Sequence, residues 1–317
     1  MTMTVDVDLA TAVAGVSLPN PVMTASGCAA AGRELDQFFD VSELGAVVTR
    51  SVTLDPRAGH PAPRMVETPS GMLGAIGLQG SGVDGFLATD LSWLAQRRAR
   101  AVVSIAGSTL GEYGELARRV GNSPGLTAIE VNLDGVSPGS RDRMFSWDPF
   151  QAARVTSVVR RDVPRGIPVF VKLSPDVTSI VDVADAVVDA GADGLVLVNT
   201  TLGLAVDPVT LRPALAGVTG GLSGPAIRPL ALRCVWQVHE AMPEIPLIGV
   251  GGVRTGFDAF EFLLAGASAV QVGTVVFHDP SAPMRIVGEL RQELAQRGIH
   301  RVADVIGRAH RPEGEAL

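Results

Sequence analysis

The chain has 317 residues, of which 46% are hydrophobic and 19% charged, so it can build a large core and extensive disorder is not expected. Its 26 basic and 33 acidic residues give a net charge of −7, which argues against binding to nucleic acid or to an anionic membrane surface. Only two cysteines occur, which excludes a disulfide framework and a cysteine-built metal site. Because the N-terminal sequence lacks the basic start of a signal peptide, and no apolar stretch suits a membrane span, we expect a cytoplasmic protein.

In chain order, residues 5–18 alternate apolar and polar and predict a small β-hairpin. Eight nearly continuous apolar runs follow, as is typical of parallel strands buried on both faces, and segments with helical spacing lie between them. This alternation predicts a closed (β/α)8 TIM barrel, with an open doubly wound sheet as the alternative. The expected strands are 22–26, 45–50, 101–106, 128–133, 168–173, 194–199, 246–250 and 269–273, and the expected helices are 34–40, 84–98, 110–120, 149–161, 179–190, 227–241, 256–265 and 281–297.

Two connections are longer than ordinary loops. Residues 51–82 and 200–225 are rich in Gly, Pro and Thr, and long ordered loops in a compact domain tend to be functional. We therefore expect them to be lids or substrate walls on a single domain that spans residues 1–317, with a frayed tail from about Arg311.

Lysine usage points to one position. The chain holds 25 arginines but a single lysine, Lys172, at the end of an expected strand. Arginine is a planar fork, whereas lysine is a compact ammonium on a thin stem. A position that keeps lysine alone is therefore expected to be a tight site.

Glycines follow the seventh and eighth expected strands, in residues 249–252 and at Gly273. In a TIM barrel these two loops lie side by side at the carboxyl ends of the strands, where phosphate sites commonly form. Glycine lets backbone N–H groups approach a phosphate closely. The two loops therefore predict a bound phosphate group.

The remaining strand ends are polar and carry no histidine, so no metal site is expected. Phosphate loops, one lysine and several amides suit flavin mononucleotide (FMN), because an ammonium beside the ring stabilises the negative charge gained on reduction. A Schiff-base lysine, as in aldolases, is the alternative. The strand-end residues are Ala25, Ser26, Gly27, Arg50, Ser51, Ser104, Asn132, Lys172, Asn199, Thr200, Gly251, Gly252, Gly273 and Thr274.

Several motifs resemble class 1 dihydroorotate dehydrogenases, most closely the class 1B catalytic subunit, from about residue 5 to about residue 307. The resemblance implies an FMN-binding barrel, usually dimeric, that oxidises dihydroorotate in pyrimidine biosynthesis. Class 1B members pass electrons to a second subunit that carries FAD and an iron–sulfur cluster. The motifs are Ala-Ser-Gly-Cys (25–28), Leu-Asp-Pro-Arg (54–57), Ser-Gly-Met-Leu-Gly-Ala-Ile-Gly-Leu-Gln (70–79), Val-Lys-Leu-Ser-Pro (171–175), Thr-Gly-Gly-Leu-Ser-Gly-Pro-Ala-Ile-Arg-Pro (219–229), Gly-Val-Gly-Gly-Val (249–253) and Ala-Gly-Ala-Ser-Ala-Val-Gln-Val-Gly-Thr (265–274).

The resemblance also assigns roles to single residues. It adds Val198 and Gly224 to the flavin-binding strand ends and places Lys172 by the flavin ring. The substrate would contact Arg50, Gly74, Ala75, Ile76, Gly77, Leu78, Asn132, Asn199 and Thr200.

The loop after the fourth expected strand departs from the family pattern. The family reads Asn-(Ile/Leu)-Ser-Cys-Pro-Asn, with the cysteine as the base, whereas this chain reads Asn-Leu-Asp-Gly-Val-Ser-Pro-Gly over 132–139. An ungapped match places Gly135 at the cysteine position. A shift of two residues places Ser137 there, and serine is the base in class 2 members. Ser137 is therefore the expected base, with Asp134 as a further candidate.

Three other positions differ from the family: Arg50 replaces a lysine, and Gly74 and Ser104 replace asparagines. Losing such hydrogen-bond partners weakens binding by about 1–3 kcal/mol each. The chain is therefore expected to be an FMN-dependent oxidoreductase that acts on a CH–CH bond of dihydroorotate, or of a different and bulkier substrate. A non-catalytic flavin-binding partner and an aldolase-like lyase are the other hypotheses.

Overall fold

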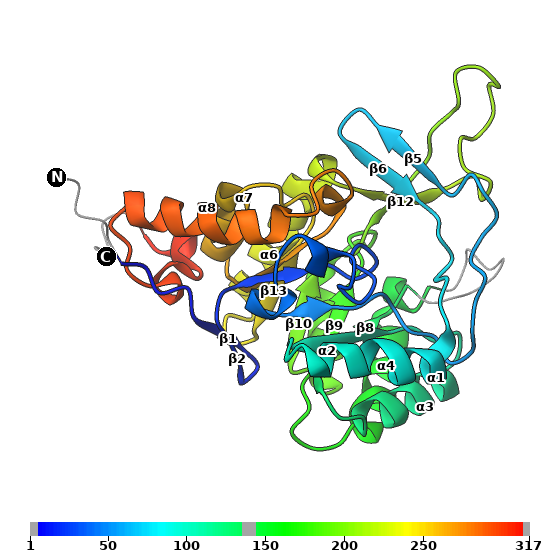
Figure 1. Ribbon diagram of the computed structural model, residues 1–317, viewed down its shortest axis with the longest axis horizontal. Coiled ribbons are helices and arrows are strands. Elements are labelled where there is room, and N and C mark those ends of the chain that lie inside the picture. Colours follow the sequence, from blue (N-terminus) through cyan, green and yellow to red (C-terminus); the bar gives the residue numbers. More distant parts are fainter. Residues whose placement is uncertain (1–5, 135–143, 313–317) are drawn as a thin grey trace.

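A computed structural model describes residues 6–134 and 144–312 (Figure 1). Its main sheet contains all eight expected strands, paired in parallel in the order β3-β14-β13-β10-β9-β8-β7-β4. A parallel bridge from Met23 to Ala46 joins the first and last strands, so the barrel prediction is confirmed. The strands are β3 (Val22–Thr24), β4 (Val47–Val48), β7 (Ala101–Ile105), β8 (Leu126–Asn132), β9 (Val169–Leu173), β10 (Gly194–Leu197), β13 (Leu247–Val250) and β14 (Ala267–Val272).

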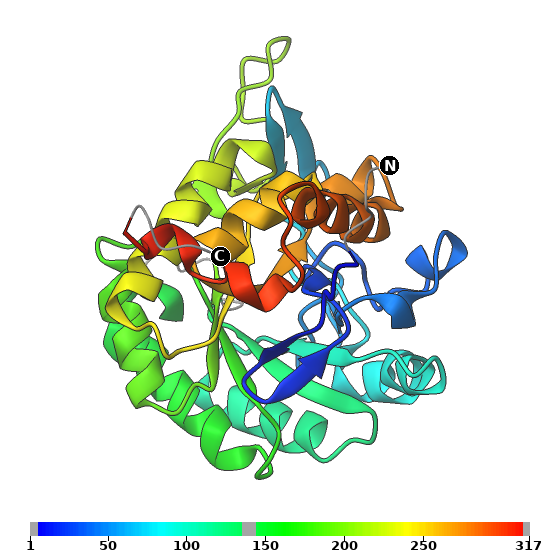
Figure 2. The same ribbon diagram turned by 90° about the vertical axis from the view of Figure 1, so that its left-hand side faces the viewer.

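Helices surround these strands (Figure 2). Side chains of Thr109, Asp148, Ser179 and Thr255 accept hydrogen bonds from the first free backbone N–H groups of four of these helices, which fixes where each begins. The helices are α1 (Gly82–Phe86), α2 (Ser92–Gln96), α3 (Leu110–Gly121), α4 (Pro149–Asp162), α5 (Ile180–Asp189), α6 (Arg228–Ala241), α7 (Gly256–Leu264) and α8 (Ala282–Gln296).

Two expected helices differ from the structure. The segment 34–40 forms a short 3-10 turn at Leu35–Gln37 instead of an α-helix, and a second 3-10 turn follows at Val41–Glu43. Asp40 lies between them in an extended conformation, and its side chain accepts a hydrogen bond from Ser42 N–H. This local bond competes with helix continuation. The segment 84–98 is helical, but a π-helical turn at Leu87–Leu91 separates α1 from α2.

The predicted hairpin is present as β1 (Thr11–Val13) and β2 (Val16–Leu18). Val13 and Leu18 are buried against the residues that fill the barrel interior, including Phe170. The hairpin therefore closes the end of the barrel opposite the carboxyl ends of the strands.

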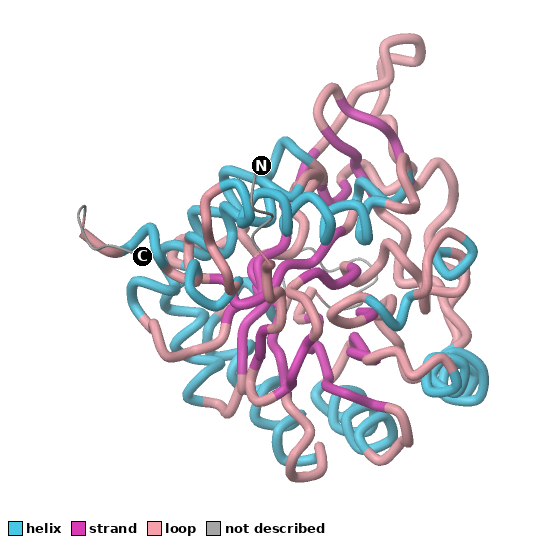
Figure 3. The backbone as a smooth tube through the Cα atoms, turned by 60° about the vertical axis from the view of Figure 1, so that its left-hand side comes forward, coloured by secondary structure: helices cyan, strands magenta, loops and turns pink. Residues whose placement is uncertain are grey.

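A second sheet was not predicted. The two long connections contribute β5 (Met65–Thr68), β6 (Gly71–Gly74), β11 (Thr201–Gly203) and β12 (Gly220–Ser223), which pair antiparallel in the order β11-β12-β6-β5. Figure 3 shows this sheet apart from the barrel strands. The prediction of loops was wrong here, because the four strands are short, glycine-rich and stabilised by pairing between distant segments. Among the described residues, no helix has the length and apolar character needed to cross a membrane.

Candidate functional site

A cavity of about 670 Å³ lies at the carboxyl ends of the barrel strands, beside the second sheet. Lys172 reaches it from β9, and Val198, Asn199 and Thr200 line it in the segment that follows β10. Parallel strands bring their carboxyl ends to one edge, so residues far apart in the chain meet there. The predicted site residues that line the cavity are Ala25, Ser26, Lys172, Val198, Asn199, Thr200, Gly224, Gly251, Gly252, Gly273 and Thr274.

The expected phosphate loops need glycine for steric reasons. Gly251 and Gly252 have φ of 132° and 73°, in the region that favours glycine. A Cβ on Gly251 would lie 2.8 Å from Ala231 Cβ, and one on Gly252 would lie 2.8 Å from the Gly224 carbonyl oxygen. The backbone at both glycines is therefore packed closely against neighbouring atoms, and a side chain at either position would displace this part of the cavity wall.

The two sheets are joined at this wall. Thr274 Oγ1, after β14, donates a hydrogen bond of 2.8 Å to Ser223 Oγ at the end of β12. Arg254 and His278 also line the cavity near these loops, although the sequence reasoning did not name them. Arg254 lies two residues after the glycine run 249–252, which is the signal that could have identified it.

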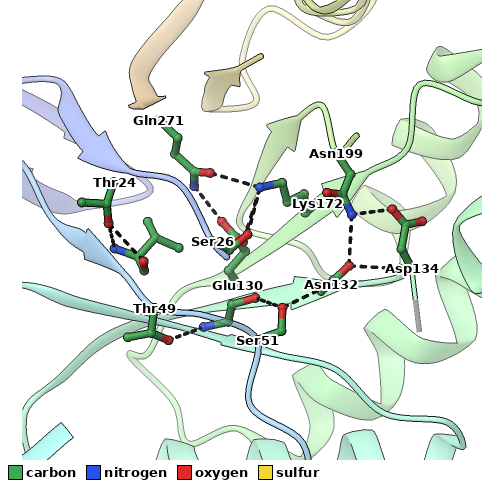
Figure 4. A network of polar contacts seen from close by, with 12 residues as sticks. Thr24, Ser26, Thr49, Ser51, Glu130, Asn132, Asp134, Lys172, Asn199 and Gln271 are labelled. Carbon is green, nitrogen blue, oxygen red and sulfur yellow. Dashed lines mark hydrogen bonds and ion pairs between the residues drawn. The ribbon is translucent and has the colours of Figure 1, made fainter. Parts of the chain in front are cut away.

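Lys172 is held in the barrel interior by three polar side chains (Figure 4). Its Nζ donates to Ser26 Oγ at 3.0 Å and to Gln271 Oε1 at 3.3 Å. Gln271 Nε2 in turn donates to Glu130 Oε2 at 2.7 Å. The sequence reasoning missed Glu130 and Gln271, yet each stands between two apolar residues of a buried strand, which is a signal that could have identified it.

A second network joins four predicted residues beside the cavity (Figure 4). Asn199 Nδ2 donates to Asn132 Oδ1 at 3.2 Å, and Asn132 Nδ2 donates to Ser51 Oγ at 3.0 Å. Ser51 Oγ lies 2.9 Å from Ser104 Oγ, and the two hydroxyls form a hydrogen bond. Asn132, Ser51 and Ser104 do not line the cavity themselves, so Asn199 is the link between this network and a ligand.

Other predicted residues lie elsewhere. The backbone of Arg50 bonds to Ala30, and neither Arg50 nor Gly27 lines the cavity. The same holds for the expected substrate segment 74–78, which is tied to the loop before β5: Ala75 N–H donates to Arg64, and His60 N–H donates to Ile76. A Cβ on Gly74 would meet no atom within 4 Å, so there is open space at this position. The members of that segment are Gly74, Ala75, Ile76, Gly77 and Leu78.

The candidates for the base that takes the substrate proton lie in and beside the loop after β8 and in the cavity wall. Ser137 and Gly135 lie outside the described residues. Burial raises the pKa of Asp134, although hydrogen bonds from Ser146 and Asn199 to its carboxylate lower it. Burial also raises the pKa of Cys28, in the cavity wall, to about 11, so its thiol is neutral near pH 7. Cys28 is therefore unsuited to replace the family's cysteine base.

A family model and several known proteins match most of the chain and agree on one family. Residues 8–294 match a family model described as dihydroorotate dehydrogenase. The chain is 48% identical over 300 residues to a Geotalea daltonii protein named dihydroorotate dehydrogenase B (NAD(+)), catalytic subunit, covering 95% of this chain and 97% of the relative. Proteins of the same name from Geobacter sulfurreducens and a Geobacillus species are 48% and 45% identical, over 95% of this chain and 97% and 95% of their own lengths.

Proposed function

The chain belongs to the dihydroorotate dehydrogenase family, and we infer that it oxidises the CH–CH bond of dihydroorotate to give orotate. The observation that carries this inference is the cavity in which the only lysine of the chain meets two glycine loops. An oxidoreductase is also what the polar, histidine-free strand ends predict. Membership of this family rules out the aldolase-like alternative.

We propose that the cavity binds FMN. The residues fit this group. Glycine at 251 and 252 lets a phosphate approach the backbone N–H groups of the loop after β13. Lys172, on β9, supplies a positive charge elsewhere in the cavity wall. The bound flavin would supply the hydride acceptor that CH–CH oxidation requires. The proposed flavin ligands are those residues of the predicted set that line the cavity.

The protein's own groups then have distinct tasks. Lys172 keeps a compact positive charge where negative charge develops, and Ser26 and Gln271 fix its direction. Asn199 orients the substrate from the network side of the cavity. Ser137 remains the proposed base that takes the proton from carbon.

The relatives are named as the catalytic subunit of dihydroorotate dehydrogenase B (NAD(+)), and this name supports the proposal of a second subunit. We propose that this chain passes electrons to a partner that carries FAD and an iron–sulfur cluster. A homodimer and a cytoplasmic location are further proposals. Size-exclusion chromatography with light scattering tests the dimer, and co-purification of an iron–sulfur flavoprotein tests the partner.

The function is tested by steady-state turnover. Purified protein reconstituted with FMN is mixed with dihydroorotate and an artificial dye acceptor, and the formation of orotate is measured. Lys172→Met should reduce the rate about 10²-fold or more, since it removes the charge that stabilises the transition state. No orotate from the wild-type holoprotein would contradict the proposal and would favour a different, bulkier substrate.

A further inference from the structure

Both amide hydrogens of Asn199 are already used inside the protein. Asn199 Nδ2 donates one hydrogen bond to Asn132 Oδ1, at 3.2 Å, and one to Asp134 Oδ2 (Figure 4). A primary amide has only two hydrogens on nitrogen. Since Asn199 lines the cavity, the group that it can still offer to a ligand is its carbonyl oxygen.

Asp134 fixes this orientation. A carboxylate only accepts hydrogen bonds, so the Asn199 side that faces Asp134 must be the nitrogen side. The carboxylate is itself held in place, because Ser146 Oγ donates to its other oxygen and Asp134 N–H donates to Asn132 Oδ1 at 3.1 Å. With both oxygens engaged, Asp134 is better placed to orient Asn199 than to act as a base.

The other hydrogen bonds of the network agree with this orientation of the Asn199 amide. Asn132 Oδ1 accepts from both Asn199 and Asp134 N–H, while Asn132 Nδ2 donates to Ser51. Turning Asn199 over would place its carbonyl oxygen against Asn132 Oδ1 and the Asp134 carboxylate, an arrangement of acceptors without donors. Such unpaired polar contacts are costly in a partly buried site.

We propose that Asp134 is a specificity-determining residue, which makes Asn199 present an acceptor and so selects substrates that offer an N–H or O–H donor at that point. The proposal rests on the proposed function and deepens it. The ring N–H groups of dihydroorotate and orotate meet this requirement, whereas a ring that carries only acceptors does not.

The orientation of Asn199 is measured without any reaction. Side-chain amide signals of the ¹⁵N-labelled, FMN-reconstituted protein are recorded by NMR, and Asn199→Ala identifies the Asn199 pair. Asp134→Asn removes the charge but keeps an oxygen that can accept, whereas Asp134→Ala removes the acceptor. Ser146→Ala is the matched control, because it removes the other hydrogen bond to the Asp134 carboxylate.

Both Asn199 amide hydrogens should exchange slowly with solvent in the wild type, in Asp134→Asn and in Ser146→Ala. In Asp134→Ala one of them should exchange at least about tenfold faster. Equal exchange in Asp134→Ala and the wild type would overturn the proposal. Equally faster exchange in Asp134→Ala and Asp134→Asn would overturn it as well. The negative charge of Asp134, and not its acceptor oxygen, would then protect the Asn199 amide.

Ligand selection is measured separately with orotate, from the change that it causes in the flavin absorbance. Asp134→Ala should bind orotate about tenfold more weakly than Asp134→Asn, although both lack the charge. Equal affinity in the two variants would contradict the selection of donors. If orotate binds to neither the variants nor the wild type, the donor requirement for this ligand and the proposed function both fail, whereas the amide exchange still reports the orientation of Asn199.

Discussion

Lys172 Nζ lies 3.9 Å from Glu130 Oε1 inside the barrel, where the two side chains are 3% and 0% exposed. Gln271 bridges them, since it accepts from Lys172 and donates to the other oxygen of Glu130. Within the described residues, Glu130 Oε1 has no hydrogen-bond partner, so the lysine is its nearest compensation. The two buried charges therefore depend on each other.

Removing one member of this pair should destabilise the fold. Glu130→Gln leaves Lys172 buried without an opposite charge, which costs about 3–5 kcal/mol in the free energy of unfolding. Lys172→Met likewise leaves the Glu130 carboxylate buried without an opposite charge. The free energy of unfolding of the double variant should fall by much less than the sum of the losses in the two single variants. Denaturant unfolding of the wild type, both single variants and the double variant measures this. Strictly additive losses would show that the two charges do not interact.

The glycine loop gives a prediction about FMN affinity. Gly252→Ala should weaken FMN binding at least about tenfold, because its Cβ would lie 2.8 Å from the Gly224 carbonyl oxygen and displace the loop. Gly166→Ala is the control: Gly166 also has positive φ, of 88°, but a Cβ there meets no atom within 4 Å. Fluorescence titration with FMN compares the two. Similar affinities in both variants would remove the phosphate role from this loop.

Asp134 gives a prediction about pH. Burial raises the pKa of this carboxyl above 3.8, its ordinary value, and Asp176 adds to the effect, while Ser146, Asn199 and Lys172 oppose it. A raised pKa in the folded state favours the protonated form, so this stabilisation is complete below pH 3.8 and is lost as the pH rises through the folded pKa.

Asp134→Asn cannot ionise and should therefore gain stability relative to the wild type as the pH rises. Thermal unfolding of both proteins between pH 4 and pH 8 measures the difference. The gap should be smallest at the acidic end, and a gap that does not change with pH would contradict the raised pKa.

Cys28 should be unreactive although it lines the cavity. With a pKa of about 11, its thiolate fraction at pH 8 is about 10²-fold below that of an ordinary thiol. Alkylation by iodoacetamide in a Cys234→Ala background should be slower than that of glutathione by at least this factor. Cys28→Ala should also keep its dihydroorotate turnover, and loss of turnover would make the thiol part of the chemistry.

The barrel could be predicted because its strands are continuously apolar, as in residues 194–199, and because glycine and proline separate them. The second sheet could not, since residues 71–74 and 220–223 pair although nearly half of the chain lies between them. Lysine usage singled out Lys172, whereas Glu130 was missed because only the folded barrel brings the two together.

The substrate-binding role of the segment 74–78 comes from the resemblance alone and stays a prediction. In this structure the segment is hydrogen-bonded to the loop before β5 and lies outside the lining of the 670 Å³ cavity. Backbone hydrogen bonds to the loop before β5 hold the segment 74–78 in this place, and backbone hydrogen bonds of this kind cannot be predicted from a sequence motif. The acceptor polarity of Asn199 likewise depends on Asp134 and Asn132 together.

The most direct test of the account is the absorbance of the FMN-reconstituted protein, recorded without oxygen before and after dihydroorotate is added. We predict that the yellow flavin spectrum bleaches and that orotate forms in equal amount. A flavin that bleaches with dithionite but stays yellow with dihydroorotate would contradict the proposed reaction. Failure to bind any flavin would contradict the assignment of the cavity itself.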